Sequence, residues 1–338
     1  MSQVKVAAVH AAAPFLNLSG SVEHALTMIQ RAASQGADVV VFPETYLPGY
    51  PYWIWSHTAK HAAPLFAELF ANSPELPGDA SQRIAAAASE SGVWVVMGID
   101  ERDGGTLYNT LAYFSPEDGL IARHRKLQPT NAERTVWGRG DGQDIFVVDT
   151  GFGRLGGLIC FEHTMDLASY SMATLGEQIH VSVWPGISAT HADPNSSSFD
   201  HYSSTLASSY AIRNQCFVIM VQGRIDQQII DKLGVSDPDD VPTIGGGLSG
   251  VLGPDGKWIA GPHRDDEDII YADLDLSTIS YAKFFADSAG HYARPDVFRF
   301  GINHAPSRPL SRQSIVRTGN VLVASEPTSE GPEQTQQD

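Results

Sequence analysis

The sequence is poor in cysteine and in basic residues, and each shortage excludes a class of protein. Its two cysteines, Cys160 and Cys216, cannot build a disulfide framework. It has 22 lysines and arginines against 39 aspartates and glutamates, and a net charge of -17 repels nucleic-acid phosphates and anionic lipid. Apolar runs of the roughly 20 residues that a membrane helix needs are also missing. We therefore expect neither nucleic acid nor a membrane as a partner.

A signal-peptide pattern is also missing at the amino terminus. Residues 1–5 lead directly into a strand-like apolar segment, and together with the low cysteine content this predicts a cytoplasmic protein. Of the 338 residues, 42% are hydrophobic and 18% are charged. Such a chain can fold around one large hydrophobic core or two modest ones.

Short apolar runs alternate with helical periodicity along most of the chain. Strands are predicted at residues 4–10, 39–42, 93–99, 108–114, 120–125, 155–159, 179–184, 217–221 and 269–274. Helices are predicted at residues 19–35, 81–91, 165–175 and 202–214. The turn at residues 115–119 joins two strands without a helix between them, which predicts an antiparallel pair. The sequence thus predicts an α/β protein with a mixed sheet.

No linker rich in proline, glycine or serine separates these elements, so we expect one catalytic domain over residues 1–305. From about Pro306 the apolar periodicity fades, and residues 325–338 are mostly Glu, Gln, Thr, Ser and Pro. Such a composition buries too little apolar surface to fold by itself. Residues 306–338 are therefore predicted to be a tail that is largely disordered after about residue 325.

Three of the predicted strands lead into residues that could carry chemistry. Glu44 follows residues 39–42, Lys126 ends the basic run at residues 123–126, and Cys160 follows residues 155–159. Each has an ordinary alternative. Glu44 could be a solvated loop glutamate, Lys126 part of a solvated basic face, and Cys160 a small buried hydrophobic residue. Active sites of α/β sheets lie at strand ends, where these three would supply a base, a cation and a nucleophile.

Cys160 gives the sharpest of these signals. It lies between a predicted strand and a predicted helix, and a thiol near a helix amino terminus has a lowered pKa that favours the thiolate. Gly156 and Gly157 before it allow close approach of other backbone. Cys216 has no carboxylate, lysine or turn beside it and serves as an internal control.

The segments around these residues resemble a known family. FPETYLPGYPYWIW (42–55), HRKLQPTNAERTVWGRGDG (124–142) and GGLICFEHTMDL (156–167) resemble the three catalytic blocks of the nitrilase superfamily. QIHVSVWPG (178–186), GGGLSGVLGPDG (245–256) and HYARPDVFRFGIN (291–303) match further blocks, and the last is typical of true nitrilases. The resemblance implies a four-layer α-β-β-α sandwich with two mixed β-sheets.

The resemblance also implies roles for individual residues. Glu44 matches the general base, Lys126 the cationic stabiliser and Cys160 the nucleophile, while Glu133 matches a second glutamate that orients Lys126. For Glu133, a surface ion pair with Arg134 is the alternative.

A substrate pocket follows from the same blocks. We expect it to be formed by Tyr50, Tyr52, Trp53, Phe161, His163, Trp184 and Pro185. These aromatic residues favour a substrate with an apolar or aromatic body, although they would equally suit a hydrophobic core. Nitrilases commonly have tryptophan directly after the nucleophile, and Phe161 lacks its indole N–H and some of its volume.

The implied activity is that of a nitrilase, which hydrolyses an organic nitrile to its carboxylic acid and ammonia through covalent thioimidate and thioester intermediates. An amidase or an amide-forming, nitrile-hydrating enzyme is the alternative within the fold, and a catalytically inactive, filament-forming scaffold is the alternative from another class. No cofactor is expected. Nor is a metal, because the 12 histidines show no HExxH spacing and those at 163, 180, 191 and 201 are scattered.

The resemblance further implies a homo-oligomer. We expect at least a dimer that pairs across the helices flanking Cys160. Residues 56–74 and 226–242 look like insertions relative to compact amidases, and a second interface there could extend the dimer into a spiral filament. The alternative is that these two segments cover the mouth of the active site.

Overall fold

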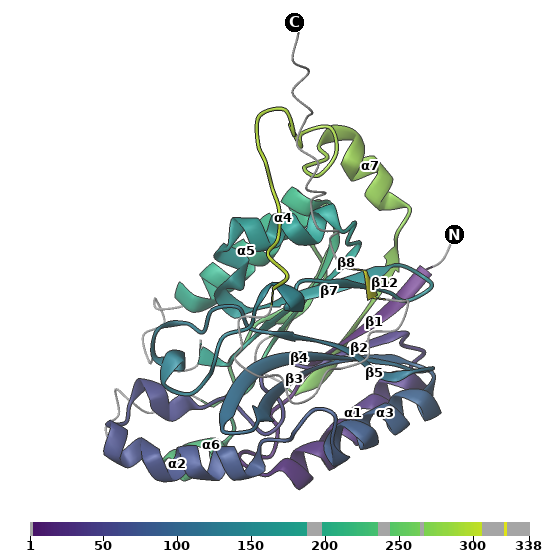
Figure 1. The fold of residues 1–338 in the computed structure, drawn as a ribbon. Coiled ribbons are helices and arrows are strands. Elements are labelled where there is room, and N and C mark those ends of the chain that lie inside the picture. The colour runs from purple at the N-terminus through teal and green to yellow at the C-terminus, as the bar shows by residue number, and fades with distance from the viewer. Residues whose placement is uncertain (1–2, 188–197, 236–243, 264–266, 306–320, 323–338) are drawn as a thin grey trace, which may run out of the picture.

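Two mixed β-sheets lie face to face in the computed structural model, and helices cover their outer faces (Figure 1). The structure describes residues 3–187, 198–235, 244–263, 267–305 and 321–322. Within these residues the arrangement is the α-β-β-α sandwich that the sequence resemblance predicts, and the fold prediction is confirmed.

The first sheet has the strand order β12-β1-β2-β3-β4-β5. Its three central strands run parallel, and antiparallel strands flank them on both sides. Helices α1 (Leu18–Ser34) and α3 (Asp79–Ser91) precede β2 and β3 and pack on the outer face. The strands are β1 (Gln3–His10), β2 (Val39–Val41), β3 (Trp94–Asp103), β4 (Thr106–Ser115), β5 (Gly119–Arg125) and β12 (Asp268–Asp275).

The second sheet has the order β11-β10-β9-β8-β7-β6-β13 and repeats the design of a parallel centre with antiparallel flanks. Helices α4 (Asp166–Thr174) and α5 (Ser198–Asn214) cover its outer face. The strands are β6 (Val147–Asp149), β7 (Arg154–Ile159), β8 (Ile179–Trp184), β9 (Phe217–Gln222), β10 (Ser249–Leu252), β11 (Trp258–His263) and β13 (Val321–Leu322).

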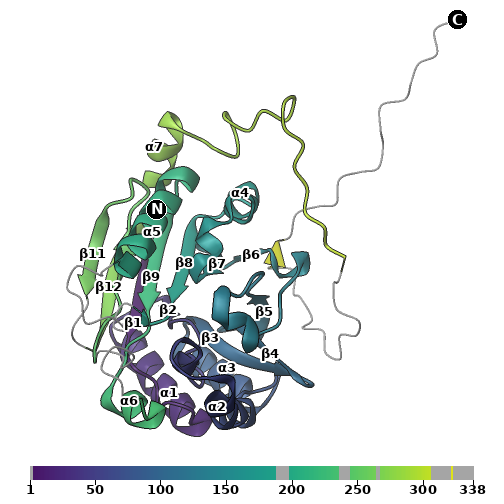
Figure 2. The same ribbon diagram turned by 90° about the vertical axis from the view of Figure 1, so that its left-hand side faces the viewer.

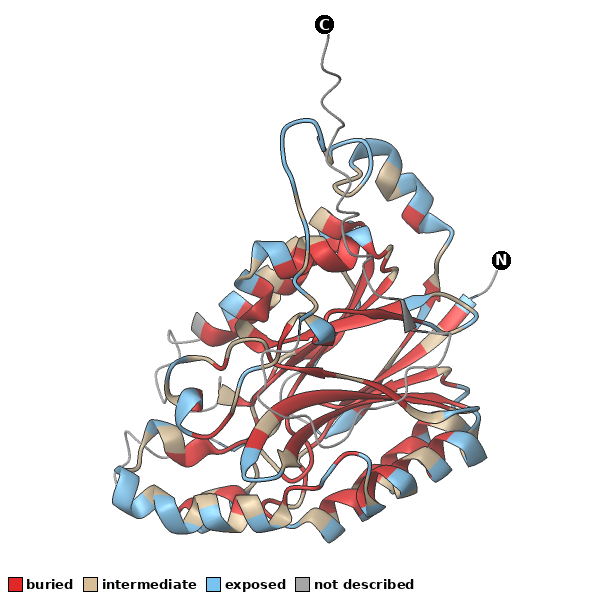
Figure 3. Ribbon diagram, in the orientation of Figure 1, coloured by how far each residue is buried: buried red, intermediate tan, exposed pale blue. Residues whose placement is uncertain are grey.

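The main hydrophobic core lies between the two sheets, where the strands are buried on both faces (Figure 3). This explains why β2 is a continuous valine run rather than an alternating pattern: one face packs against helices and the other against the second sheet. Gly157 shows how closely the sheets approach. A Cβ atom at this position would lie 2.7 Å from the hydroxyl oxygen of Tyr113 on β4.

Further helices lie in the connections between the strands around the sandwich. They are the 3-10 helices η1 (Tyr52–Trp55), η2 (Asn131–Thr135), η3 (Gly142–Asp144) and η4 (Cys160–Thr164), and the α-helices α2 (Ala59–Asn72), α6 (Gln227–Leu233) and α7 (Thr278–Phe285). Figure 2 shows the chain after α7 running out past α4.

Helices α2 and α6 belong to the two segments predicted to be insertions, and they pack together. Lys232 Nζ lies 2.6 Å from Glu68 Oε1, and His57 Nε2 lies 3.0 Å from the carbonyl oxygen of Leu233. Both helices share one hydrophobic cluster with the aromatic turn at η1, beside the segment that carries Glu44. The two segments therefore lie together beside η1. Residues 236–242 of the second segment lie outside the described residues.

The predicted strands and helices are confirmed, and β4 and β5 form the predicted antiparallel pair. Within the predicted tail, Val321 and Leu322 form the short strand β13, which pairs with Val148 and Val147 of β6. The rest of residues 306–338 lies outside the described residues. Among the helices that the structure describes, none has the length and apolar character needed to cross a membrane.

Candidate active site

Glu44, Lys126 and Cys160 meet at one end of the sandwich, because the strands before them end there. Glu44 follows β2, Lys126 follows β5, and Cys160 follows β7 of the opposite sheet. Lys126 Nζ lies 2.9 Å from Glu44 Oε1 and 2.8 Å from Glu133 Oε2. Single donor atoms of Glu44, Glu133 and Cys160 lie within 4.8 Å of one another. The structure thus brings all four predicted catalytic residues into one buried cluster.

Glu44 has the electrostatic properties of a base that works near neutral pH. Its Oε1 accepts hydrogen bonds from Lys126 and from Asn109 Nδ2, the latter at 2.6 Å. Its Oε2 has no hydrogen-bond partner within the described part of the chain. Burial, with a smaller contribution from Glu133, outweighs the opposing effects of Lys126 and Asn109, and the net result is a pKa of about 7 for Glu44. The free oxygen can therefore take up a proton.

Lys126 remains a cation in spite of its burial. Burial lowers its pKa, but the carboxylates of Glu133 and Glu44 outweigh that effect and raise the pKa well above its usual value. The ring of Trp137 lies under the ammonium group, with Nζ 5.8 Å from the ring centroid. A fixed cation at this position can stabilise negative charge that develops on a nearby nitrogen or oxygen.

Glu133 is held by three donors on its two oxygens. Lys126 and the Thr130 N–H donate to Oε2, the latter at 2.7 Å, and the Tyr50 hydroxyl donates to Oε1 at 2.9 Å. Arg134, the alternative ion-pair partner, donates instead to the carbonyl of Pro129 at 3.1 Å. Glu133 therefore fixes the position of the ammonium group from inside the site.

Cys160 begins η4 with a φ of 54°, in the left-handed region that L-residues rarely adopt. The lowered pKa predicted for its thiol is not what the structure gives. Burial raises the pKa of Cys160 well above its usual value, and Lys126 and the Phe161 N–H oppose the rise without overcoming it. A five-residue 3-10 helix does not offset the loss of solvent. This shift favours the thiol form of Cys160, so a nucleophilic role would require a neighbouring base to take its proton.

Glu162 ties two of these strand ends together, although its sequence position gave no sign of it. It accepts the Ile159 N–H at 2.7 Å and the Leu127 N–H at 2.6 Å, next to Cys160 and Lys126 in the chain. His124 Nε2 contacts it at 2.8 Å. Burial raises the pKa of Glu162, but His124 outweighs this and lowers it. Burial lowers the pKa of His124, yet Glu162 raises it to about 9, so the two form a buried ion pair.

Tyr50, Tyr52 and Trp53, predicted to bind substrate, are buried in one hydrophobic cluster at η1. Tyr50 contacts Glu133 through its hydroxyl, and the Tyr50 ring meets Trp137 edge-on with centroids 5.6 Å apart. Tyr50 and Tyr52 also line a small pocket that reaches Glu44, together with Phe15, Arg224 and Ile229 among others.

The other predicted pocket residues lie on the side of Cys160. The ring of Phe161 meets Trp184 and Phe199 edge-on, with centroids 5.9 Å apart in both cases. Phe161, which is smaller than the tryptophan common at this position, therefore packs within an aromatic cluster. Pro185 is buried directly after β8. His163 stacks on Trp184, and both of its ring nitrogens are engaged within the protein, by the Cys160 carbonyl and by His180.

Two groups of side chains have donor types that also suit metals. Glu44, Glu133 and Cys160 are close enough to share an ion, but Lys126 lies between the two carboxylates and bonds to both. His163 and His180, which look scattered in the sequence, have their Nε2 atoms 3.0 Å apart, a hydrogen-bond distance. The geometry of both groups is that of proton-transfer and hydrogen-bonding chemistry.

Comparison with known proteins agrees with this geometry. Residues 5–284 match the carbon-nitrogen hydrolase family, and the chain belongs to this family, the nitrilase superfamily. An aliphatic nitrilase from Rhodococcus rhodochrous is 39% identical over 311 residues, which cover 90% of this chain and 81% of the relative. A nitrilase from Bacillus sp. (strain OxB-1) is 36% identical over 309 residues, which cover 90% of this chain and 90% of the relative.

The same architecture occurs in solved structures. A carbon-nitrogen hydrolase from Helicobacter pylori G27 superposes with a TM-score of 0.70 at 19% identity, covering 89% of this chain and 100% of the other. At this identity the likeness concerns the fold.

Proposed function

We propose that this protein is a nitrilase of the true nitrilase branch, which converts an organic nitrile to a carboxylic acid and ammonia. The observation that carries the proposal is the contact of one cation, Lys126, with two buried carboxylates beside the Cys160 thiol. Nitrilases at 36–39% identity along most of the chain support it.

The chemistry starts with a proton transfer. Glu44 Oε2 takes the proton of Cys160 Sγ, and the thiolate forms a bond to the nitrile carbon. The electron pair released from the C≡N bond goes to nitrogen, where the ammonium group of Lys126 stabilises it. The proton that Glu44 took from Cys160 passes to this nitrogen and gives a thioimidate, which leaves Glu44 a carboxylate again. Water adds to this carbon and ammonia leaves, so that a thioester remains. A second water, deprotonated by Glu44, releases the acid and returns the proton to Cys160.

An amide-forming activity is the second candidate from the same site. After the first water adds, the tetrahedral intermediate can expel the Cys160 thiolate instead of ammonia and release an amide. The raised pKa of Cys160 makes its thiolate a poorer leaving group, which favours expulsion of ammonia and an acid product.

Purified protein incubated with aliphatic, aromatic and arylaliphatic nitriles tests the proposal, with ammonia, acid and amide quantified separately. Acid and ammonia in equal amounts are expected. An amide as the main product would instead assign the nitrile-hydrating activity, and no product from any nitrile together with hydrolysis of amides would assign an amidase.

Nitriles with an uncharged, apolar body are the proposed substrates. Support comes from the aromatic side chains on both sides of the catalytic cluster, Tyr52 next to Glu44 and Phe161 next to Cys160. An ammonium group on the substrate would lose its hydration there and would meet the cation Arg224, which lines the same pocket. In the same screen, nitriles bearing an ammonium group should have the lowest kcat/KM.

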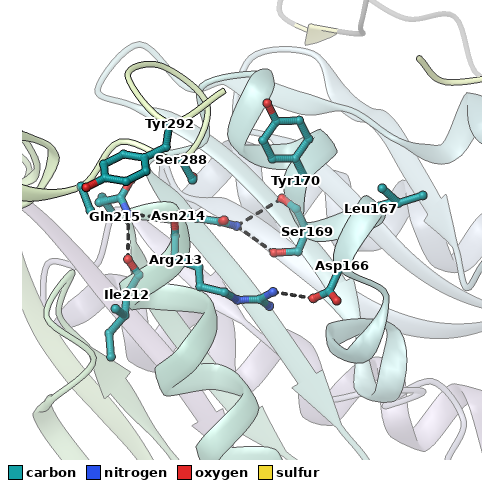
Figure 4. A pocket seen from close by; sticks show the side chains of 11 residues that line it. Asp166, Leu167, Ser169, Tyr170, Ile212, Arg213, Asn214, Gln215, Ser288 and Tyr292 are labelled. Atoms are coloured by element: carbon teal, nitrogen blue, oxygen red, sulfur yellow. Dashed lines mark hydrogen bonds and ion pairs between the residues drawn. The ribbon is translucent and has the colours of Figure 1, made fainter. Parts of the chain in front are cut away.

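A homo-oligomer in a reducing, cytoplasmic compartment is also part of this proposal. Both cysteines are free, as a thiol nucleophile requires. The face formed by α4, α5 and the chain after α7 carries a hollow of about 510 Å³, lined by Leu167, Ile212 and Tyr292 among others (Figure 4). These three side chains are 70%, 52% and 68% exposed, and such apolar surfaces are typical of interfaces between subunits.

A further inference from the structure

A chain of buried hydrogen bonds leads from the nucleophile away from the substrate side of the site. The carbonyl oxygen of Cys160 contacts His163 Nδ1 at 2.6 Å, and His163 Nε2 contacts His180 Nε2 at 3.0 Å. His180 Nδ1 contacts Glu177 Oε1 at 2.8 Å, and the Tyr210 hydroxyl donates to Glu177 Oε2 at 2.6 Å. The proposed reaction uses none of these groups.

The carbonyl at one end fixes the direction of every bond in the chain. A carbonyl oxygen only accepts, so His163 Nδ1 carries a hydrogen. In a neutral imidazole Nε2 is then an acceptor, and His180 must donate to it from its own Nε2. If His180 is also neutral, its Nδ1 is an acceptor, and Glu177 has to donate a proton to it.

The hydrogen-bond chain from Cys160 to Glu177 therefore holds one proton between Glu177 and His180. That proton is either on the carboxyl of Glu177 or on Nδ1 of His180, and both placements let His163 donate to Cys160. If the chain loses it, Glu177 becomes an acceptor on both oxygens and a neutral His180 turns its N–H toward Glu177. His163 must then donate to His180, and its Nδ1 lone pair faces the carbonyl of Cys160.

The surroundings of Glu177 favour keeping the proton. Gly156 makes room for the carboxyl group, because a Cβ atom there would lie 2.3 Å from Glu177 Oε1. The titratable groups that face Glu177 are His180 on β8, Tyr210 on α5, Tyr113 on β4 and Cys216 before β9.

Burial raises the pKa of Glu177 to about 8, with the Tyr210 hydroxyl opposing the rise. Burial also lowers the pKa of His163 to about 3 and that of His180 well below its usual value. The charged groups near the two histidines are Glu162 and His124, and Arg213 near His163. Below about pH 8 the proton is present, and as the pH rises through about 8 it is lost.

We infer that Glu177 is a positioning residue, which acts through His180 and His163 to hold the carbonyl of Cys160 while the chain keeps its proton. The inference rests on the proposed function. Cys160 needs such support because its φ of 54° is unfavourable for an L-residue. Loss of the proton replaces an attraction at the carbonyl by a repulsion, so that Cys160 leaves the conformation in which its thiol faces Glu44.

The Glu177→Gln variant distinguishes this positioning role from a purely structural one, because of the chemistry of the new side chain. Its amide nitrogen can donate to His180 and its oxygen can accept from Tyr210, which copies the protonated carboxyl group without titrating. We expect Glu177→Ala to lower kcat on the order of tenfold or more with a smaller change in KM, and Glu177→Gln to restore most of that loss. We also expect Glu177→Gln to remove the decline of kcat above about pH 8.

Two tyrosines provide a matched pair of variants. Tyr210→Phe removes the hydroxyl that donates to Glu177 and should move the alkaline decline to higher pH, by about one unit. Tyr113→Phe removes an equally buried hydroxyl that has no hydrogen-bond partner in the described residues, and should leave the decline where it is. Thermal unfolding of each variant shows whether it is folded.

Alkylation of Cys160 by iodoacetamide, followed by peptide mass spectrometry, gives a readout that needs no nitrile. Above about pH 8 the wild type should react more slowly than Glu177→Gln, and at pH 7 the two should react alike. If no nitrile is hydrolysed but this difference appears, the proposed function fails and the positioning role holds. A Glu177→Gln variant with the wild-type alkaline decline and wild-type alkylation at every pH would overturn the inference.

Discussion

Lys126 Nζ lies 2.9 Å from Oε1 of Glu44, so the cation and the base are hydrogen-bonded to each other before any substrate arrives. The bond occupies one carboxylate oxygen and leaves Oε2 as the oxygen that can take a proton. Lys126 also neutralises part of the charge of Glu44 and Glu133, because its removal leaves two buried carboxylates without their cation.

The pKa of Glu44 should set the acid limb of the activity profile. Glu44 works as a base only when deprotonated, and with a pKa of about 7 its activity should fall as the pH drops below 7. Asn109 donates to the carboxylate and lowers this pKa, so Asn109→Leu should move the acid limb to higher pH. The measurement is kcat/KM from pH 5 to 9.

Thr110→Val is the control for that variant. Thr110 is the next residue on β4 and donates to a different buried carboxylate, Glu101, at 2.8 Å. Its acid limb should coincide with that of the wild type. A shift of equal size in both variants would show that β4 as a whole, and not the bond to Glu44, sets the pKa.

Lys126→Ala should abolish formation of the covalent intermediate and also destabilise the fold. Removing one partner of a buried ion pair costs about 3–5 kcal/mol, because the remaining charges are desolvated and unpaired. Denaturant unfolding measures the stability, and mass spectrometry of quenched reactions detects a thioimidate or thioester on Cys160. Lys232→Ala breaks the exposed pair with Glu68 and should cost no more than about 1 kcal/mol with activity intact.

Glu44→Gln should also prevent the intermediate, for a different reason. Glutamine cannot accept the thiol proton, and the raised pKa of Cys160 leaves almost no thiolate at neutral pH without a base. Trapping an intermediate in this variant at the wild-type rate would show that another group activates Cys160.

Cys160→Ala should lose turnover entirely while its thermal unfolding stays close to that of the wild type, since a small side chain replaces another at the start of η4. Cys216→Ala is the matched control. Cys216 is equally buried but follows α5, away from Lys126 and Glu44, and should keep most of the activity. Equal loss of ammonia release in both variants would contradict the assignment of the nucleophile.

The sequence was sufficient to find the residues that end strands. Polar residues that follow apolar runs stand out, and strands of the two sheets that end on the same side bring Glu44, Lys126 and Cys160 together. The short strands β6 and β10 were not predicted, although the equally short β2 was found from the apolar run at residues 39–42.

Residues that act through distant partners could not be found this way. Asn109 reaches Glu44 from the middle of β4, across 65 positions in the chain. Glu177 lies in a turn between a helix and a strand, where a solvated carboxylate would be expected. Its burial follows from Tyr210, which is 33 residues further along the chain. The predicted direction of the pKa shift at Cys160 was wrong for a related reason. The pKa is raised by burial, and burial depends on how the two sheets pack together, which the residues near Cys160 in the sequence do not reveal.

Assembly provides the last prediction. The face of α4, α5 and α7 carries the exposed aromatic residues Phe284 and Phe285, with 81% and 62% of their surface accessible, beside the hollow at Tyr292. Burying this face in a homodimer would remove that apolar surface from water, so Phe284→Glu should weaken self-association by placing a charge in the interface. Light scattering at several concentrations measures the mass.

Ile259→Glu is the control, because Ile259 is 47% exposed on β11 and lies outside that face. We expect the wild type and this control to be dimeric or larger, and Phe284→Glu to shift toward the monomer. The packing of α2 against α6 directs much of their apolar surface inward, so a further interface there would have to use polar contacts. Particles larger than a dimer that persist at low salt and dissociate at high salt would indicate such an interface, whereas an active wild type that stays monomeric would refute the dimer.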